Sequence, residues 1–434
     1  MDRERIALRE LLSQDPADIA ETLGELSEEQ AAELLHRLYL GGAAARTLAE
    51  MDPGESADLV RKLDRQVAST ILSRMDPDDA VDLLEELPED VRKELLSRLS
   101  RLDAKRLTEL LAYPPDSAGG LMTPEVVALS LSMTAQDAID VLRQRQEKAG
   151  TIYYAYAVDD ANHLQGVLSL RDIALARPER SLGELVIRDA VSVRVEQDVE
   201  DVAKLFDKYD FFALPVVDGE NRLLGVITVD DVIDVIRDEA TEDIYHLASV
   251  PSAEGVDTSW WDSLRLRLPW LYAKLLTGLA AALVVGFFEQ TIVKVAALAV
   301  AMGVIVGQGG VSGMQTATII TRGMALGEID RRRGFRLFGK EMLLGLANGL
   351  LLGGTVGLIM YAWKGDALLG VAVSIAMLLN VVVAGMIGVL IPMLLRAIGK
   401  DPAVASSIVL TAITDALGFA LLFILAGLLL PALR

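Results

Sequence analysis

Residues 403–431 read AVASSIVLTAITDALGFALLFILAGLLLP, an apolar stretch in which Asp415 is the one charged side chain. A helix of about 20 apolar residues is long enough to cross the hydrocarbon core of a bilayer. Four further segments of sufficient length and apolarity precede it: residues 270–288, 295–321, 338–362 and 367–395. The chain is therefore predicted to be an integral membrane protein with five transmembrane helices.

The distribution of basic residues predicts how these helices are oriented. Arg265 and Arg267 precede the first segment, six basic residues lie in 322–340, and Arg396 and Lys400 follow the fourth segment. The two alternate loops carry one basic residue each. Because cytoplasmic loops are enriched in Lys and Arg, we expect the N-terminal half to be cytoplasmic and the C-terminus to face outside.

The half of the chain that precedes the membrane segments is strongly acidic. Residues 1–259 carry 54 acidic and 27 basic side chains. A nucleic acid has the same sign of charge and is not expected as a partner, whereas cations would reduce the self-repulsion. A merely solvated acidic surface is the alternative. The chain has no cysteine, which excludes disulfides and thiolate metal sites.

Residues 1–112 are predicted to be helical, since Leu and Ala recur at three- and four-residue spacing. Asp-Pro pairs at 15–16, 52–53 and 76–77 predict helix starts, because Asp caps free N–H groups and Pro fits the first turn. MDPGESADLVRKL and MDPDDAVDLLEEL repeat at an offset of 24 residues, which indicates stacked short helices. Carboxylates crowd the third start and either complement the helix dipole or hold a divalent cation.

A second repeat follows the Pro/Gly-rich boundary YPPDSAGG at 113–120. QGVLSLRDIALA (165–176) and LGVITVDDVIDV (224–235) lie 59 residues apart, each predicted as helix, strand, strand, helix. The pair resembles tandem CBS domains, in which the Thr and Asp of Gly225-x-x-Thr228-x-x-Asp231 can contact a nucleotide ribose. A role limited to dimerisation and hinge motion is the alternative.

The second copy continues into an acidic helix, TVDDVIDVIRDEATEDIYHL. Several of its carboxylates are three or four residues apart and share a helix face, where like charges destabilise an isolated helix. A divalent cation would neutralise them, and a solvated acidic helix is the alternative. These carboxylates are Asp231, Asp234, Asp238, Glu239, Glu242 and Asp243.

Polar residues inside the membrane segments indicate a candidate ion path. Asp415 lies in the middle of the fifth segment, and Thr411 and Thr414 precede it. An ionised carboxylate is costly in lipid, so we expect it to face a water-filled path or a partner. The second segment contains VGQGGVSGMQTAT, whose glycines permit either close helix packing or local unwinding.

Several motifs in the same order give the chain a resemblance to the MgtE-type magnesium channels over nearly its whole length. The matching strings are AGGLMTPE (118–125), TIYY (151–154), GVLSLRD (166–172), LPVVD (214–218), TVDDV and EATEDI (228–244), an ATxxxRxxALGE-like stretch at 317–328, and T-D-x-x-G around Asp415.

The resemblance implies a multidomain fold: an all-α superhelical N domain (1–120), α+β tandem CBS domains (121–182 and 183–240), an acidic linking or plug helix with its connector (241–268), and an α-helical transmembrane domain with five helices (269–434). It also implies a homodimer in the bacterial plasma membrane with a pore between the subunits. Cytoplasmic Mg²⁺ is expected to close that pore.

The resemblance assigns residues to three kinds of site. The pore residues are Asp415, Thr411, Gly309 and Gly310. The cytoplasmic Mg²⁺-sensing carboxylates are Asp78, Asp82, Asp198, Glu200, Asp210, Asp231, Asp234, Glu239, Glu242 and Asp243. The third kind is an ATP site in the CBS domains, at Tyr154, Arg171, Asp172, Phe211 and Pro215.

Two positions depart from the family pattern. Val311 stands where the second segment of relatives usually has an Asn, and Ser407 stands where an Asn is common in the fifth. No P-loop is present, so we expect passive transport driven by the ion gradient and the membrane potential. The resemblance implies a protein that is not an enzyme but a Mg²⁺-selective channel or transporter of divalent cations, gated by cytoplasmic Mg²⁺. The alternatives are a proton-coupled divalent cation transporter and a membrane-anchored cation sensor.

Overall fold

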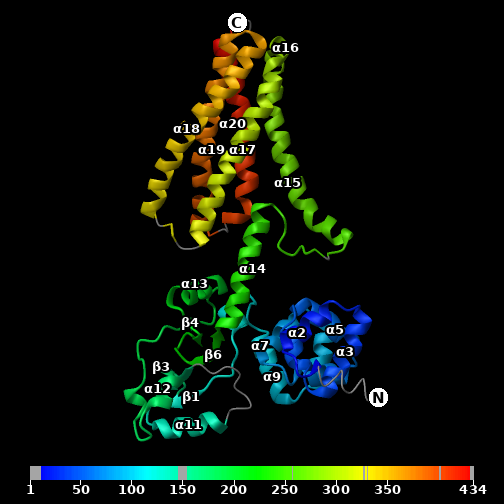
Figure 1. Ribbon diagram of the computed structural model, residues 1–434, viewed down its shortest axis with the longest axis vertical. Coiled ribbons are helices and arrows are strands. Elements are labelled where there is room, and N and C mark those ends of the chain that lie inside the picture. Colours follow the sequence, from blue (N-terminus) through cyan, green and yellow to red (C-terminus); the bar gives the residue numbers. More distant parts are fainter. Residues whose placement is uncertain are drawn as a thin grey trace. The chain divides into compact units, whose positions relative to one another are not determined.

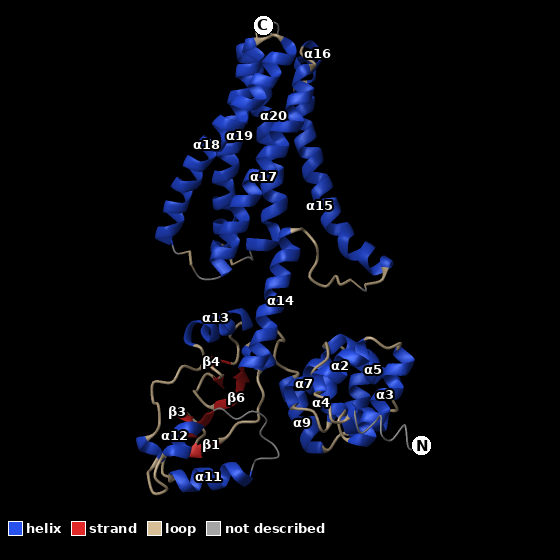
Figure 2. Ribbon diagram, in the orientation of Figure 1, coloured by secondary structure: helices blue, strands red, loops and turns tan. Residues whose placement is uncertain are grey.

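The computed structural model describes residues 11–144, 154–256, 258–325, 328–329, 331–399 and 402–430. It divides into two compact units, residues 1–236 and 237–434, each of which is described by itself. All of the named strands belong to the first unit and are drawn red in Figure 2. Residues 151–153 and 326–327, which belong to two of the sequence motifs, and the loop residue Lys400 lie outside the described residues.

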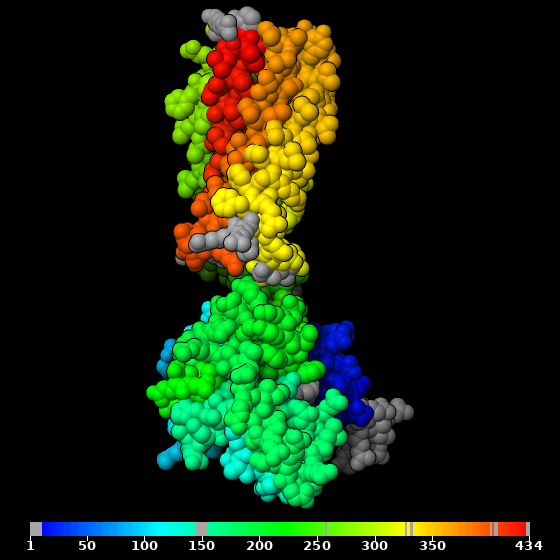
Figure 3. Space-filling model, turned by 90° about the vertical axis from the view of Figure 1, so that its left-hand side faces the viewer, coloured from blue at the N-terminus to red at the C-terminus, as the bar shows by residue number. Residues whose placement is uncertain are grey.

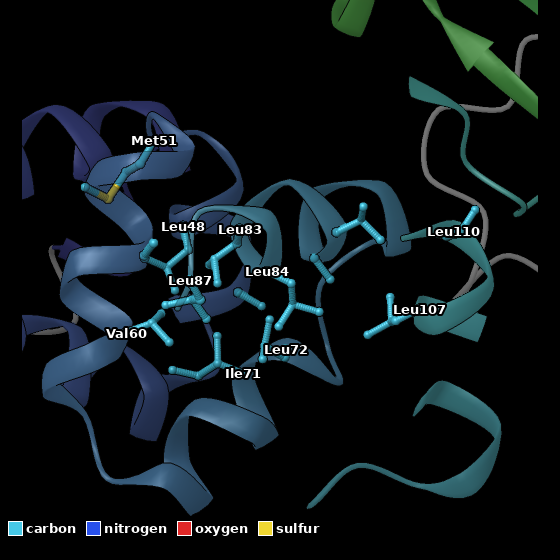
Figure 4. Close-up of a cluster of buried hydrophobic side chains, with 14 of the residues drawn as sticks. Leu48, Met51, Val60, Ile71, Leu72, Leu83, Leu84, Leu87, Leu107 and Leu110 are labelled. Atoms are coloured by element: carbon cyan, nitrogen blue, oxygen red, sulfur yellow. The ribbon is translucent and has the colours of Figure 1, made fainter. Parts of the chain in front are cut away.

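The first unit begins with the predicted stack of short helices (Figure 1). They are α2 (Pro16–Gly24), α3 (Glu28–Gly41), α4 (Ala44–Ala49), α5 (Pro53–Lys62), α6 (Arg65–Leu72), α7 (Pro77–Glu85), α8 (Glu89–Arg98) and α9 (Arg101–Leu110). Each helix buries one apolar face, and Figure 4 shows Leu48, Val60, Ile71, Leu72 and Leu84 converging in the shared core.

The three Asp-Pro helix starts are confirmed in position, but only two of the three Asp side chains cap their helix. Asp15 accepts a hydrogen bond from the N–H of Ala17, and Asp52 accepts one from the N–H of Gly54. Asp76 occupies the same position before α7, yet its side chain makes no capping bond. Asp78, in the first turn of this helix, has a buried carboxylate oxygen, Oδ1, for which no described residue supplies a hydrogen-bond partner.

Two small mixed sheets follow, one in each CBS copy. The first copy comprises α10 (Ala118–Leu121), β1 (Ala128–Ser130), α11 (Ala135–Gln144), β2 (Tyr154–Val158), β3 (Leu164–Ser169) and α12 (Leu170–Leu175). The second comprises the 3₁₀ turn η1 (Leu182–Glu184), β4 (Val193–Arg194), α13 (Val199–Tyr209), β5 (Ala213–Val217), β6 (Leu223–Thr228) and α14 (Val229–Leu247). In each sheet a parallel pair is followed by an antiparallel pair. The sequence pattern missed β1 and β4, because two or three residues are too few to show alternation.

The two copies contact each other through a pseudo-symmetric pair of turns. Asn162 and Asn221 are 59 positions apart and both have positive φ, which Asn tolerates better than most residues. The amide of Asn162 donates to the carbonyl of Leu223, and the amide of Asn221 donates to the carbonyl of Leu164. These reciprocal bonds join the β-hairpins of the two repeats.

The second unit contains five helices that are long and apolar enough to span a membrane. Its helices are α15 (Trp260–Phe287), α16 (Glu289–Lys294), α17 (Ala297–Ala325), α18 (Arg331–Lys364), α19 (Ala367–Ala397) and α20 (Pro402–Leu429). Helix α15 starts ten residues before the predicted span, and the short α16 was not expected. The linker before α15 is held to it by the ion pair between Glu254 and Arg267.

Helix α20, which carries Asp415, packs against α15, α17 and α19, and α19 also packs against α17 and α18. Figure 3 shows α20, in red, between the green α15 and the orange and yellow segments of α19 and α18. Glycines bring α18 and α19 close: an added methyl at Gly349 would lie 2.9 Å from the backbone of Leu378. Such small-residue contacts are typical of helix packing in membranes.

Candidate ion path and candidate cation-sensing site

Asp415 lies at the level of the glycines of α17. Two contacts between α17 and α20 bracket it: Gly418 lies against Val306, and Gly313 lies against Leu410. The two helices run antiparallel, because the residue numbers along α20 decrease as those along α17 increase. Asp415 precedes Gly418 by three residues and is therefore level with Gly309 and Gly310. Asp415, Gly309 and Gly310 therefore lie at the same level along the two helices, with Thr411 about one turn away, although Gly309 faces α19.

The carboxylate of Asp415 is half-buried. Within the described residues it makes no hydrogen bond and no ion pair, and Lys274 of α15 is the charged group that acts on it electrostatically. A structural salt bridge therefore does not account for Asp415. A carboxylate held this way inside a membrane helix is suited to attract a cation.

The hydroxyl groups near Asp415 are mostly engaged with their own helix. Thr411 donates to the carbonyl of Ser407, 2.6 Å away, and the fully buried Thr414 donates to the carbonyl of Leu410, 3.0 Å away. A hydroxyl that donates in this way keeps acceptor lone pairs. Thr411, which is half-buried, can therefore still offer oxygen to a cation or to its water.

Val311 and Gly310 lie on a side of α17 that the rest of the described chain leaves open. The side chain of Val311 is 53% exposed, and a methyl group added at Gly310 would meet no atom within 4 Å. Gly309, by contrast, is buried against α19. Only a portion of the glycine stretch therefore faces away from the helix core.

Two buried polar residues in the membrane unit were missed by the sequence analysis. Asn380 of α19 is fully buried against Gly309. Glu341 of α18 is 5% exposed and accepts a hydrogen bond from Thr316, 2.9 Å away. Asn380 interrupts the apolar run of the fourth segment, the same signal that singled out Asp415. Glu341 stands near the basic residues at the start of the third segment and resembles an interfacial charge.

The cytoplasmic unit gathers acidic residues from two distant segments of the chain. Asp78, Asp79 and Asp82 lie in α7, and Asp231 lies in the first turn of α14. We call these four residues the aspartate group. Asp231 acts electrostatically on each of the other three, so the N domain and the second CBS copy meet with like charges facing each other.

The pKa values of the aspartate group reflect this crowding. Desolvation, followed by repulsion from Asp231, raises the pKa of Asp78 to about 7. Desolvation and neighbouring carboxylates raise the pKa of Asp79 to about 8 and that of Asp82, whose side chain is still reached by solvent, to about 7. Desolvation raises the pKa of Asp231 to about 6, although its hydrogen bond with Thr228 (2.6 Å) opposes the rise. No basic side chain of the described residues is among the causes of these shifts, so protein cations do not neutralise the group.

The aspartate group lacks the geometry of a direct metal cage. Among the described residues, no three His, Cys, Asp or Glu side chains are arranged to hold a metal ion directly. Mg²⁺ holds its water shell tightly and is often bound by few carboxylates through that shell. The group therefore fits a hydrated divalent cation better than a dehydrated one.

The remaining predicted sensing carboxylates have other local roles in the structure. Asp198 caps α13 by accepting from the N–H of Glu200, and Glu200 pairs with Lys204, 3.0 Å away. Asp210 ends α13 in a left-handed conformation. None of these three is among the charges that shift the pKa values of the aspartate group. Asp234 is another acid of α14 that acts on Asp231.

Three predicted sensing residues, Glu239, Glu242 and Asp243, belong to the stretch of α14 in the second unit. Glu242 lies 3.5 Å from the ring of His246, one turn further along the helix. The predicted acidic helix is confirmed as a continuous helix.

The predicted nucleotide residues are divided between the two CBS copies. Tyr154 begins β2 and packs in an apolar cluster with Ala213 and Val226 of the second copy. Pro215 pairs with Val226 in the neighbouring sheet. Arg171 and Asp172 are exposed in the first turn of α12, and Phe211 stacks on Tyr209 at 5.3 Å. The structure brings Tyr154 near the strand that carries Pro215.

A helical N domain, paired CBS domains and five membrane-spanning helices with an intramembrane carboxylate are typical of a multi-pass membrane transport protein with a cytoplasmic region. Family models match all three regions. A divalent cation transporter model, MgtE, matches residues 302–425, the MgtE intracellular N domain matches 14–116, and CBS domains match 118–179 and 182–238. The chain belongs to the MgtE family of divalent cation transporters.

Relatives and solved structures agree with this assignment. The chain is 41% identical over 328 residues to the magnesium transporter MgtE of Thermus thermophilus, covering 74% of this chain and 72% of that protein. It is 38% identical over 309 residues to magnesium transporter MgtE of Enterococcus faecalis, covering 71% and 68%.

Among solved structures, the cytosolic domain of the Mg²⁺ channel MgtE in complex with ATP matches with a TM-score of 0.51 and 38% identity. The match covers 54% of this chain and 94% of the chain in that solved structure. The soluble part of a magnesium transporter matches with a TM-score of 0.52 and 34% identity, covering 55% and 94%.

Proposed function

We propose that this protein is a Mg²⁺-conducting channel that moves divalent cations down their electrochemical gradient. The observation that supports this most strongly is Asp415, an intramembrane carboxylate level with Gly309 and Gly310 and without a protein ion pair in the described residues. In a homodimer, two such carboxylates would bind a hydrated Mg²⁺ through its waters. The membrane potential contributes about 2.3 kcal/mol per charge per 100 mV to inward movement.

The domain division proposed from the sequence, with boundaries at residues 120, 182, 240 and 268, gives every domain a single role. The N and CBS domains sense the ion in the cytoplasm of a bacterial cell, the linking helix transmits the signal, and residues 269–434 conduct. The family-level function is transport, so we assign no enzymatic activity.

Gating by cytoplasmic Mg²⁺ is supported by the aspartate group. Its carboxylates face each other across the contact between the N domain and the second CBS copy, and their pKa values are raised by burial and mutual repulsion. A divalent cation would neutralise them and hold the contact closed. When cytoplasmic Mg²⁺ falls, repulsion separates the two domains and the pore opens.

ATP is proposed as a second cytoplasmic ligand, bound near Tyr154 and Pro215. Support comes from the solved relative, which contains ATP, and from the packing of Tyr154 against the second CBS copy. Lipid, divalent cations and a second copy of the chain are the remaining proposed partners.

The decisive experiment is reconstitution of the full chain into liposomes that contain a fluorescent Mg²⁺ reporter. We expect Mg²⁺ entry that follows the ion gradient without any proton gradient. Asp415→Asn keeps the side-chain shape and should reduce flux about tenfold or more, the factor that 1.4 kcal/mol of lost attraction supplies. Flux that requires a proton gradient would instead identify a proton-coupled transporter, and absence of flux would identify a membrane-anchored sensor.

A further inference from the structure

A buried amide lies where three membrane helices meet. Asn380 of α19 has no exposed surface and is surrounded by α17, α19 and α20. A polar side chain inside a membrane bundle is costly unless it is hydrogen-bonded, so its presence calls for a physical reason.

Only the nitrogen of the Asn380 amide has a hydrogen-bond partner among the described residues. Its nitrogen donates a hydrogen bond to the carbonyl oxygen of Ile305 on α17, 2.9 Å away. Its oxygen is buried and accepts no hydrogen bond from any described residue. An apolar side chain of the same shape would avoid that unmet acceptor. The bond to α17 is therefore the contribution that distinguishes Asn from Leu at this position.

Two glycines on two other helices make room for the amide. A methyl group built at Gly309 on α17 would collide with the amide nitrogen of Asn380. One built at Gly418 on α20 would approach the same nitrogen to 3.0 Å. Both glycines have ordinary helical conformations, so close approach, not backbone strain, explains them.

The position of this contact links it to the candidate ion path. Gly309 is level with Asp415, and Gly418 follows Asp415 by less than one turn of α20. The side chain that sets the separation of α17 and α20 therefore does so beside the carboxylate, and helix separation sets the width available to a hydrated ion.

We propose that Asn380 is a positioning residue that fixes the spacing of α17 and α20 at Asp415, and thereby the discrimination between divalent cations. The amide acts through the helix backbones and does not touch the ion. This inference rests on the proposed function for its transport readout, whereas its packing readout is independent of transport.

The packing half is tested by a double-mutant cycle on the full chain in detergent. Gly309→Ala should lower the temperature of unfolding by several degrees, because the methyl group meets the amide. Asn380→Ala removes the amide that this methyl group would meet. The double variant Gly309→Ala/Asn380→Ala should therefore be more stable than the sum of the two single effects predicts, as is common for residues in contact. Gly303→Ala is the matched control, since a methyl group there meets no atom within 4 Å. Strict additivity overturns the inference, even if the protein transports nothing.

The discrimination half is tested with Asn380→Leu, which keeps the shape and removes the bond to Ile305. We expect the variant to fold with nearly unchanged stability, while the ratio of Mg²⁺ to Ca²⁺ flux in liposomes changes roughly threefold or more, as coupling of neighbouring groups allows. A merely structural role would change stability and leave that ratio alone. An unchanged ratio overturns the inference where the wild-type protein conducts Mg²⁺, and absence of wild-type flux would refute the proposed function instead.

Discussion

The hydroxyl oxygens of Ser249 and Ser407 lie 2.7 Å apart, so the segment that follows α14 is hydrogen-bonded to α20. Ser407 is 3% exposed, and its carbonyl accepts a hydrogen bond from Thr411, one turn before Asp415. The hydroxyl of Ser407 therefore joins the segment after the acidic helix to the helix with the candidate pore carboxylate.

Removing the hydroxyl of Ser249 should weaken this connection. A neutral hydrogen bond contributes about 0.5–1.5 kcal/mol, so Ser249→Ala should raise the cytoplasmic Mg²⁺ concentration that halves flux by about two- to tenfold. Liposome flux at graded Mg²⁺ measures this concentration. Ser252→Ala, in the same linker but exposed, is the control and should leave it unchanged. Equal behaviour of the two variants would show that the bond plays no role in gating.

Neutralising one member of the aspartate group should reduce the need for a cation. Two unit charges 4 Å apart repel by about 4 kcal/mol at an effective dielectric constant of ~20. Asp231→Asn removes the charge that acts on Asp78, Asp79 and Asp82, so the cytoplasmic unit should resist protease even without Mg²⁺. The wild-type protein should resist only when Mg²⁺ is present. Identical wild-type digestion with and without Mg²⁺ would contradict the gating mechanism.

The same carboxyls predict how the domain contact depends on pH. Their pKa values are about 6 to 8 in the closed contact and 3.8 when unperturbed, so the closed contact binds more protons than the separated domains. Without Mg²⁺, the contact should therefore lose stability as pH rises from about 4 to about 8 and change little above that range. Saturating Mg²⁺ should remove most of this dependence, because the cation replaces the protons.

Protease protection measured from pH 6 to 8 checks the prediction, with Asp231→Asn as the variant in which the slope should be smaller. Calorimetry in buffers of different ionisation enthalpy should also show proton release when Mg²⁺ binds at about pH 7. Protection that is independent of pH in the absence of Mg²⁺ would count against the aspartate group as the sensor.

The predicted topology places the N-terminus inside and the C-terminus outside. Five spans require the two ends to lie on opposite sides, and the basic residues of 322–340 favour the cytoplasm for that loop. A reporter enzyme that functions only in the cytoplasm should be inactive when fused after Arg434 and active when fused before Met1. The reverse result would refute the orientation.

The sequence was sufficient for features that repeat or extend over many residues. Apolar length predicted the five spans, and the 24- and 59-residue repeats predicted the helix stack and the CBS pair. It was insufficient for β1 and β4, whose few residues carry no alternation. The sequence also could not predict that Gly309 and Gly418 both contact Asn380, because these three residues belong to segments that are distant in the chain.

The candidate site residues also differ in how far the sequence alone could predict them. Asp415 stood out because ionisable residues are rare in membrane segments, and the structure adds that it is level with Gly309. The link between Asp78 and Asp231 was implied only by resemblance, since 153 positions separate them. Asn380 could have been found by the rule that singled out Asp415, whereas Ser249 gave no sequence signal, because an isolated Ser in a linker has many equivalents.

Val311 offers the most direct test of ion discrimination. It has no ligand atom where the family resemblance leads us to expect an amide, and its side chain is 53% exposed. A path without this amide relies on Asp415, Thr411, backbone carbonyls and the waters of the ion. Such a path separates divalent from monovalent ions by charge, but it discriminates less among Mg²⁺, Mn²⁺ and Co²⁺, which share octahedral hydration.

We therefore expect Mn²⁺ to compete with Mg²⁺ flux in the wild-type protein and to compete less in Val311→Asn. The restored amide would contribute a hydrogen bond to the water shell of the ion, worth about 0.5–1.5 kcal/mol, or roughly two- to tenfold in the competition constant. Val304→Asn is the matched control, because Val304 is exposed two turns earlier on α17, away from the level of Asp415. If Val311→Asn changes neither flux nor competition, position 311 does not face the ion path and selectivity must be set by the Gly309–Asn380 contact and Asp415 alone.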